Sequence, residues 1–316
     1  MQQPEKNGTS CKLQFNREIH SRAACWCCFA PDASSIASAG EDRTIRFTNP
    51  KDGSQMAEPI TQPDAAYCVS FSSDALLVAS TTLRTSVLLW RSPLIYSTDP
   101  SRVAALVDHD IVTHCLFSPV GHSLAVANRD GSVSLWDAEV LTLSRKFYGH
   151  CSIVYCTSFS EDGRIMASAS DDGLCRIWDL RSENSVRKMC GSGDQLVSCT
   201  LSPSQPLVAS SCRDQSIFIW DMRTGRELHK LQGHTALVRH VAFASHSSLL
   251  ASASWDGTVR LWDTVAGTQR HVLRGHNEWA LCCAFAPYLG GAADEQLCTT
   301  GLDHVLQCWQ VSGSRR

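Results

Sequence analysis

The chain has 316 residues, of which 43% are apolar and 19% charged, a balance that can bury a sizeable core and excludes wholesale disorder. Its 28 basic and 31 acidic residues give a net charge of -3, which argues against nucleic-acid binding through phosphate neutralisation. The longest uncharged run, 111–128, contains Pro119 and Gly121, so we expect no membrane-spanning helix.

The cysteine content indicates a reduced, intracellular protein, located in the cytoplasm, the nucleus or both. Sixteen cysteines are fewer than disulfide scaffolds of this length carry, and no apolar signal segment begins the chain. Cys25 and Cys28 have the spacing of metal ligands, but no second pair follows at a suitable distance. We therefore expect core cysteines, with no metal or cofactor.

Taken in chain order, the predicted organisation begins with a flexible tail over residues 1–11 and ends with a tail over 313–316. Between them, residues 12–312 form one domain of seven repeated units. Trp136, Trp178, Trp220 and Trp262 lie 42 residues apart, and each is followed by aspartate. The seven units end near Thr48, Trp90, Trp136, Trp178, Trp220, Trp262 and Trp309.

Each unit alternates β-prone runs with turn residues, as in the unit that ends at Trp178. Strands are predicted over 154–159, 165–170 and 174–178, with turns over 160–163 and 171–173. No helical period competes with this pattern. A period near 42 with strand signals alone predicts an all-β, seven-bladed β-propeller, in which each four-stranded blade covers its neighbour.

The two ends of the domain predict how the ring closes. The last unit ends at a strand over 305–311 with no strand after it, whereas a strand-like segment over 12–17 precedes the first unit. We expect this N-terminal segment to supply the missing strand of the last blade, because that pairing removes an exposed edge.

The Trp-Asp pairs, together with Gly-His pairs at 149–150, 233–234 and 275–276, resemble the WD40-repeat (WD-repeat) family. The resemblance covers roughly residues 12–312. It implies a buried hydrogen-bond network in each complete blade, running from histidine through Ser or Thr and Asp to tryptophan. The matching sets are His150, Ser168, Asp172 and Trp178; His234, Ser252, Asp256 and Trp262; and His276, Thr299, Asp303 and Trp309. Their recurrence argues for a structural role rather than for catalytic triads.

Four units depart from this pattern, and we expect the divergent N-terminal blades to be softer. The first has Thr48 in place of tryptophan beside His20, Ser38 and Asp42. The others carry Gln62, Ser80 and Arg84 in the second, Asp108 or His109 with Val126 in the third, and Ser192 in the fifth.

No catalytic or phosphate-binding motif occurs, so we expect a noncatalytic scaffold that binds proteins or peptides. The family resemblance implies ligand contacts on the narrow face around the central channel. The corresponding positions are Tyr67, Arg129, Tyr155, Asp171, Arg213, Arg239 and Trp255. We expect Arg129, Arg213 and Arg239 to pair with an acidic or phosphorylated peptide, the alternative being that they are only solvated.

Arg181 and Arg223 follow the Trp-Asp pairs of two successive units and resemble the WDxR box of substrate receptors for cullin-RING ubiquitin ligases. This resemblance implies an adaptor on the opposite face as an alternative function. A scaffold subunit of an RNA-processing or chromatin complex is a further alternative. In each case we expect a monomeric propeller within a larger complex.

Insertions over 92–108 and 288–295 are expected to be solvent loops.

Overall fold

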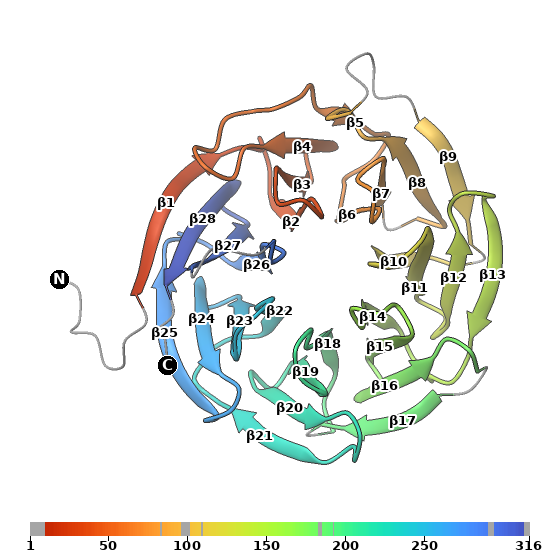
Figure 1. The fold of residues 1–316 in the computed structure, drawn as a ribbon, viewed down its shortest axis with the longest axis vertical. Helices are drawn as coiled ribbons and strands as arrows, with labels where there is room; N and C mark the ends of the chain where they lie inside the picture. Colours follow the sequence, from red (N-terminus) through yellow and green to blue (C-terminus); the bar gives the residue numbers. More distant parts are fainter. Residues whose placement is uncertain are drawn as a thin grey trace.

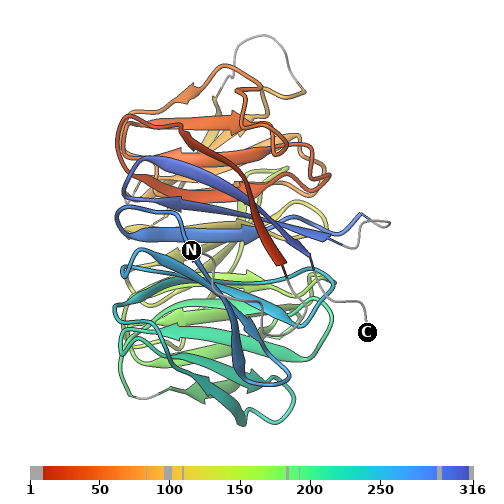
Figure 2. The same ribbon diagram turned by 90° about the vertical axis from the view of Figure 1, so that its left-hand side faces the viewer.

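The computed structural model describes residues 10–82, 84–95, 102–108, 110–182, 185–191, 193–289 and 294–312, with the backbone alone for Ser185 and Val186. The described residues form seven four-stranded antiparallel sheets arranged as a ring around a central channel (Figure 1). Seen from the side, the ring is a disk (Figure 2). The predicted seven-bladed β-propeller is confirmed, and we number the blades in chain order of their innermost strands.

The strands of each blade run from the channel to the rim. The first three blades contain β2 (Ala24–Phe29), β3 (Ile36–Gly40), β4 (Thr44–Thr48) and β5 (Ile60–Thr61); β6 (Cys68–Phe71), β7 (Leu77–Thr81), β8 (Ser86–Arg91) and β9 (Arg102–Val107); and β10 (Val112–Phe117), β11 (Ser123–Asn128), β12 (Val133–Asp137) and β13 (Thr142–Phe147). The fourth and fifth contain β14 (Val154–Phe159), β15 (Ile165–Ser170), β16 (Leu174–Asp179) and β17 (Ser185–Cys190), then β18 (Leu196–Leu201), β19 (Leu207–Cys212), β20 (Ile217–Asp221) and β21 (Glu227–Leu231). The sixth contains β22 (Val238–Phe243), β23 (Leu249–Ser254), β24 (Thr258–Asp263) and β25 (Thr268–Arg274), and the seventh β26 (Ala280–Phe285), β27 (Asp294–Gly301), β28 (Val305–Ser312) and β1 (Ser10–Glu18).

The fourth blade shows why these residues form strands. Alternating β-branched, aromatic and small residues give β14 and β15 the bounds predicted from the sequence, while β16 continues one residue further, to Asp179. Glycines end the connecting turns at Gly163 and Gly173, whose φ angles of 66° and 78° lie in the left-handed region that glycine adopts without strain.

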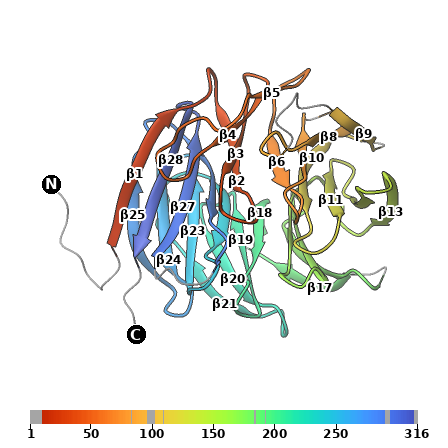
Figure 3. The ribbon, with the colours of Figure 1, turned by 45° about the horizontal axis from the view of Figure 1, so that its top comes forward.

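The ring closes as predicted. Strand β1 pairs antiparallel with β28 from Ser10↔Ser312 to Glu18↔Val305, with one irregularity between Leu13 and Phe15. The two strands lie side by side in Figure 3, and β1 is the outermost strand of the seventh blade. It begins at Ser10, two residues before the predicted segment. The same blade therefore holds the first and the last described strand of the chain.

The prediction that residues 92–108 form only a solvent loop is wrong for their second half, because β9 is the outermost strand of the second blade. The alternation of Leu106, which is buried, with exposed Val103 and Val107 is the strand signal that was missed. In the second insertion β27 already begins at Asp294, and residues 290–293 lie outside the described residues. Of the predicted tails over 1–11 and 313–316, residues 1–9 and 313–316 lie outside them as well, and Ser10 and Cys11 belong to β1. The positions His109 and Ser192 also lie outside the described residues.

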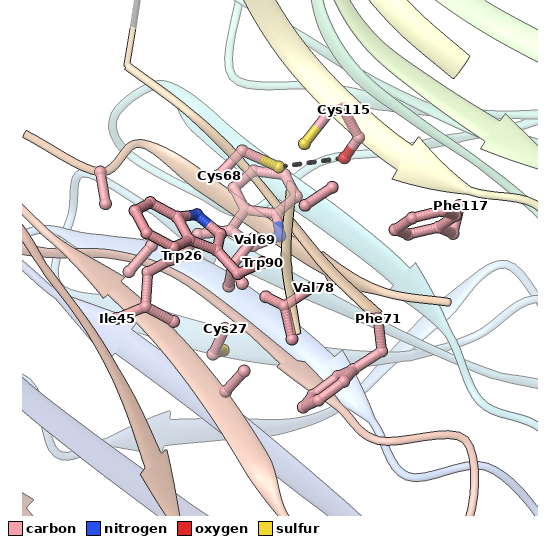
Figure 4. Packing of buried hydrophobic residues seen from close by; sticks show 14 of the residues in the cluster. Trp26, Cys27, Ile45, Cys68, Val69, Phe71, Val78, Trp90, Cys115 and Phe117 are labelled. Atoms are coloured by element: carbon pink, nitrogen blue, oxygen red, sulfur yellow. Dashed lines mark hydrogen bonds between the residues drawn. The ribbon is translucent and has the colours of Figure 1, made fainter. Parts of the chain in front are cut away.

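Apolar side chains fill the space between neighbouring blades. Figure 4 shows part of the largest cluster, in which Trp26, Ile45, Phe71 and Trp90 pack together. All sixteen cysteines are free, and most are buried. The residues that the structure describes include no group of metal-ligating side chains and no helix long and apolar enough to cross a membrane.

Candidate protein-interaction surface

Two blades hold their loops with a closed chain of hydrogen bonds. In the fourth, His150 Nδ1 donates to Asp172 (2.9 Å), Ser168 Oγ donates to His150 Nε2 (2.8 Å), and the Trp178 indole donates to Ser168 Oγ (2.8 Å). The carboxylate acceptor assigns the proton to Nδ1. The sixth blade repeats this arrangement through His234, Asp256, Ser252 and Trp262, with distances of 2.8, 2.7 and 2.8 Å. Both networks match the prediction.

The charge states of these networks follow from burial and pairing. Burial alone would raise the pKa of Asp172, but the His150 imidazole and the backbone N–H of Cys151 outweigh it and hold that pKa below its usual value. Burial lowers the pKa of His150, and Asp172 only partly compensates. The His150 imidazole is therefore neutral at pH 7. The Asp172 carboxylate is then the single charged group of this hydrogen-bond network.

The seventh blade completes only part of the predicted network. His276 bonds Asp303 (2.9 Å) and Thr299 Oγ1 (3.0 Å), but the buried Trp309 indole N–H has no hydrogen-bond partner among the described residues. The strand register is the same as in the complete blades, since Leu297 faces Trp309 as Met166 faces Trp178. The complete blades have serine at this position, whereas the seventh has threonine, whose Cβ methyl restricts χ1. The predicted link from Thr299 to Trp309 is wrong.

The first, second and fifth blades keep parts of the network. In the first, His20 bonds Asp42 and Ser38, both at 2.9 Å. In the second, Ser80 Oγ donates to Gln62 (2.8 Å) and accepts from the Trp90 indole (3.0 Å). In the fifth, the Trp220 indole donates to Ser210. Each indole bond spans the same two strands as in the fourth blade.

The third blade uses a buried ion pair. Asp108, the first of the two predicted alternatives, accepts hydrogen bonds from Ser134 and Asn128. Lys146 Nζ lies 3.1 Å from Asp108 and 3.3 Å from Asp130. Val126 is fully buried at the position that holds serine elsewhere. A carboxylate thus takes the place of the histidine.

Side chains from the innermost strands link successive blades around the channel. The Cys68 thiol donates to the Cys115 carbonyl in the next blade (3.2 Å), as Figure 4 shows. Equivalent bonds run from Cys156 to Cys199, from His240 to Cys283 and from Cys282 to Cys27. These bonds are individually weak, but they recur at one level of the ring.

The channel is blocked at this level by Trp26. Its ring lies 5.0 Å from the His114 ring and 4.5 Å from the His240 ring, centroid to centroid. These three residues come from the first, third and sixth blades, so the indole spans the channel. The Trp26 indole thus narrows the channel below its entrance.

A recurrent β-bulge supplies the side chains at one entrance to the channel. In the fourth blade Val154 pairs with Ser170 and Cys156 with Ala169, which leaves Tyr155 as the extra residue. Arg239 is the extra residue of the sixth blade in the same way. Bulges turn a side chain away from the regular pleat. We use "channel mouth" for this entrance, bounded by the bulges and by the turns after β3, β7, β11, β15, β19, β23 and β27.

The channel mouth brings four of the predicted residues together around Tyr155. Its hydroxyl donates to Asp171 (3.2 Å), which also accepts from Ser152 (2.9 Å). Burial and Asp171 raise the pKa of Tyr155, whereas the guanidinium groups of Arg213 and Arg239 act in the opposite direction. The phenol is thus bonded to one anion and lies within the electrostatic influence of two cations.

Of the other predicted residues, Tyr67 lies near Glu41 and Cys25 on another side of the mouth, where burial and Glu41 raise its pKa. Arg129 is exposed, and its guanidinium makes no hydrogen bond or ion pair with the described residues. Trp255 stacks on Trp279, with ring centroids 4.3 Å apart and an interplanar angle of 11°. The seven predicted residues thus form separate groups rather than one cluster.

The repeat pattern matches a known family. A family model described as "WD domain, G-beta repeat" matches residues 11–49, 100–137, 141–179, 183–221 and 225–263, which is more than half of the chain. The chain belongs to the WD40-repeat family. WD40 propellers generally act by binding other proteins rather than by catalysis, which supports the role of protein-interaction scaffold for this WD40 chain.

One curated relative of this WD40 protein is "WD repeat, SAM and U-box domain-containing protein 1" of Danio rerio. The two are 26% identical over 140 residues, which is 43% of this chain and 26% of the relative. The matched segment thus spans about a quarter of that relative's length.

The two arginines of the WDxR boxes lie at the other ends of the strands, on the face opposite the channel mouth. Arg181 forms a two-pronged ion pair with Asp179, with Nε 3.0 Å from Oδ1 and Nη2 2.7 Å from Oδ2. Arg223 donates its backbone N–H to Asp221, and its exposed guanidinium has no partner among the described residues. The two boxes of this WD40 propeller therefore differ, because the Arg181 guanidinium is already paired within the chain and the Arg223 guanidinium is not.

Sequence reasoning missed Trp279. It immediately precedes β26, where other blades carry Ile153 or Leu237, and 43% of its surface is exposed. The available signal was a tryptophan at a position that is aliphatic in most units of this WD40 chain. It was missed because the residue belongs to no WD40 motif.

Proposed function

We propose that this WD40 propeller is a noncatalytic scaffold that holds an extended segment of a protein partner at the channel mouth. In this proposal Arg213 and Arg239 bind an acidic or phosphorylated residue of the segment. The observation that carries it is that Arg213 and Arg239 both lie near enough to Tyr155, at the channel mouth, to act on its pKa. Arginine binds carboxylate and phosphate with two parallel hydrogen bonds, which gives both affinity and orientation.

The remaining contacts of this group fit a recognition site. Arg213 is exposed, and its only side-chain bond within the described residues goes to Gln195 (3.0 Å). Asp171 is already engaged by Tyr155 and Ser152, so its charge is partly satisfied. The blocked channel below keeps a partner at the surface, where Arg129 can add a peripheral contact.

The test replaces both arginines, Arg213→Glu with Arg239→Glu, and compares the variant with a matched control, Arg164→Glu with Arg226→Glu, on the opposite face. Partners are quantified by affinity purification with mass spectrometry. Binding is then measured directly with acidic, phosphorylated and neutral peptides from the partners. We expect at least a tenfold loss for the mouth variant and little change for the control. Equal recovery with the two variants would contradict the proposal.

A second candidate function uses the opposite face. Arg181 and Arg223 lie in equivalent turns of neighbouring blades, and both are exposed, as an adaptor of a cullin-RING ligase would require. Arg181→Ala with Arg223→Ala is expected to abolish co-purification of adaptor and cullin while leaving the mouth partners bound. Retention of adaptor in that double variant would rule this candidate out.

A further inference from the structure

The stacked tryptophans form a rigid aromatic surface at the channel mouth. Trp255 follows β23 and Trp279 precedes β26, so the stack joins the sixth and seventh blades. Their backbones are fixed: Trp255 N–H donates to Leu237, and Trp279 accepts from the Leu302 N–H, both at 2.9 Å. Trp279 is the more exposed of the two, so Trp255 supports it from behind.

A close backbone approach holds the neighbouring loop in place. Gly257 has a φ of 77°, and a Cβ there would lie 3.1 Å from the Glu278 carbonyl. Only glycine fits this turn without strain. The position of Glu278, next to Trp279, is therefore set by packing between two blades.

The charged groups around Trp279 favour the binding of a cation there. Glu278 is exposed and forms no ion pair with the described residues. The other two carboxylates nearby, Asp256 and Asp303, are already bonded by His234 and His276. Glu278, next to Trp279 in the chain, thus carries a negative charge without an ion-pair partner in the described part of the chain, while Arg239 belongs to the channel side of the sixth blade.

We propose that the exposed face of Trp279, supported by Trp255 and flanked by Glu278, binds an arginine side chain of the partner. A planar guanidinium stacks on an indole face and can donate two hydrogen bonds to a carboxylate beside it. This inference rests on the proposed function, since it adds a basic residue to the acidic one that Arg213 and Arg239 bind. The partner segment would then carry both charges, and their order would fix its direction across the mouth.

The test uses the purified protein and small probes, so it needs no knowledge of the partner. The indole N–H resonances of the nine tryptophans are followed by NMR, and Trp279 is assigned with Trp279→Phe. Nα-acetyl-arginine amide is titrated to millimolar concentration against Nα-acetyl-citrulline amide, its neutral isostere. We expect a saturable shift of the Trp279 and Trp255 signals with arginine and none with citrulline.

Variants separate the possible outcomes. Glu278→Gln should weaken arginine binding about two- to fivefold, the range expected for one exposed charge contact, and Trp279→Leu should abolish it. Equal binding of citrulline, or an undiminished Trp255 shift in Trp279→Leu, would overturn the proposal. Nα-acetyl-lysine amide or Nα-acetyl-phenylalanine amide binding as tightly as arginine would do the same.

The two proposals can fail separately. Arg213→Glu with Arg239→Glu should leave the arginine titration saturable, because neither guanidinium makes a hydrogen bond or cation–π contact with the tryptophan pair in the described residues. If that variant also leaves partner recovery unchanged, the proposed function fails while the arginine site stands. If partner recovery depends on Arg213 and Arg239 but no arginine shift occurs, only the further inference fails.

Discussion

The third and fourth blades hold the same loop by different chemistry. In the fourth, neutral His150 joins Asp172 to Ser168, so one anion is shared among several donors. In the third, Asp108 meets the Lys146 ammonium, whose side chain is only 10% exposed. The geometry of a blade is therefore compatible with either a neutral histidine network or a buried ion pair. What differs is the penalty for losing one partner, because a buried charge without its counterion costs far more than a broken neutral hydrogen bond.

The largest effect is expected from Lys146→Met. It removes the ammonium group beside the buried Asp108 carboxylate and should lower the free energy of unfolding by about 3–5 kcal/mol. Lys230, in the outermost strand of the fifth blade, is the matched control: its Nζ lies 3.3 Å from Asp214, but its side chain is 36% exposed. Urea denaturation should show at most about 1 kcal/mol for Lys230→Met.

A compensating variant makes this comparison stricter. Asp108→Asn combined with Lys146→Met removes both charges and should recover most of the loss. A double variant as unstable as Lys146→Met alone would show that packing, not the unpaired charge, sets the cost.

The sequence predicted most of the fold because its signals are local and repeated. Each blade can be recognised from its own turn glycines, its Trp-Asp pair or the 42-residue spacing. Seven repeated units then identify the ring. The contacts that were not predicted depend on side-chain direction or on residues far apart in the chain. Trp26 blocks the channel because its indole reaches His114 and His240 across the ring, and no local pattern encodes that.

The candidate site was predicted less completely for the same reason. The bulges place Tyr155 and Arg239 where the family resemblance implies, and their positions could be counted from the strand. Whether Arg129 joins them depends on loop geometry, as does the stack of Trp255 on Trp279. Arg181 was predicted only as a possible adaptor contact, and its ion pair with Asp179 was not predicted.

An intermediate effect is expected from pH, because, of the two networks, only that of the fourth blade contains an imidazole among the described residues. The pKa of His150 is lowered by burial, so the unfolded chain binds a proton more readily than the folded chain. The stabilisation from neutral His150 is complete above the unfolded pKa of about 6.5 and is lost as the pH falls towards the folded pKa. The contribution of His150 to stability should therefore decrease between pH 7 and pH 5.

Replacing His150 by the residue that the second blade uses tests this directly. Gln62 accepts from Ser80 at the equivalent position, so His150→Gln should keep the bond to Ser168 and cost about 1 kcal/mol at pH 7. Its unfolding free energy should change less than that of the wild type between pH 7 and pH 5. A His229→Gln control should retain the wild-type slope. An identical slope in His150→Gln would mean that this histidine does not titrate on unfolding.

The smallest effect is expected in the seventh blade, where the network lacks the hydrogen bond from the Trp309 indole. Thr299→Ser removes the methyl that restricts Oγ1 and should let the Trp309 indole donate to it, as Trp178 donates to Ser168. The new hydrogen bond contributes about 1 kcal/mol, but the lost methyl costs nearly as much, so stability should change by less than about 1 kcal/mol. The sensitive measurement is hydrogen exchange of the Trp309 indole N–H, which should slow. Ser168→Thr is the reverse experiment, and it should speed hydrogen exchange of the Trp178 indole N–H. Unchanged exchange in both variants would mean that the Cβ methyl does not control the hydrogen bond from the tryptophan indole to the hydroxyl.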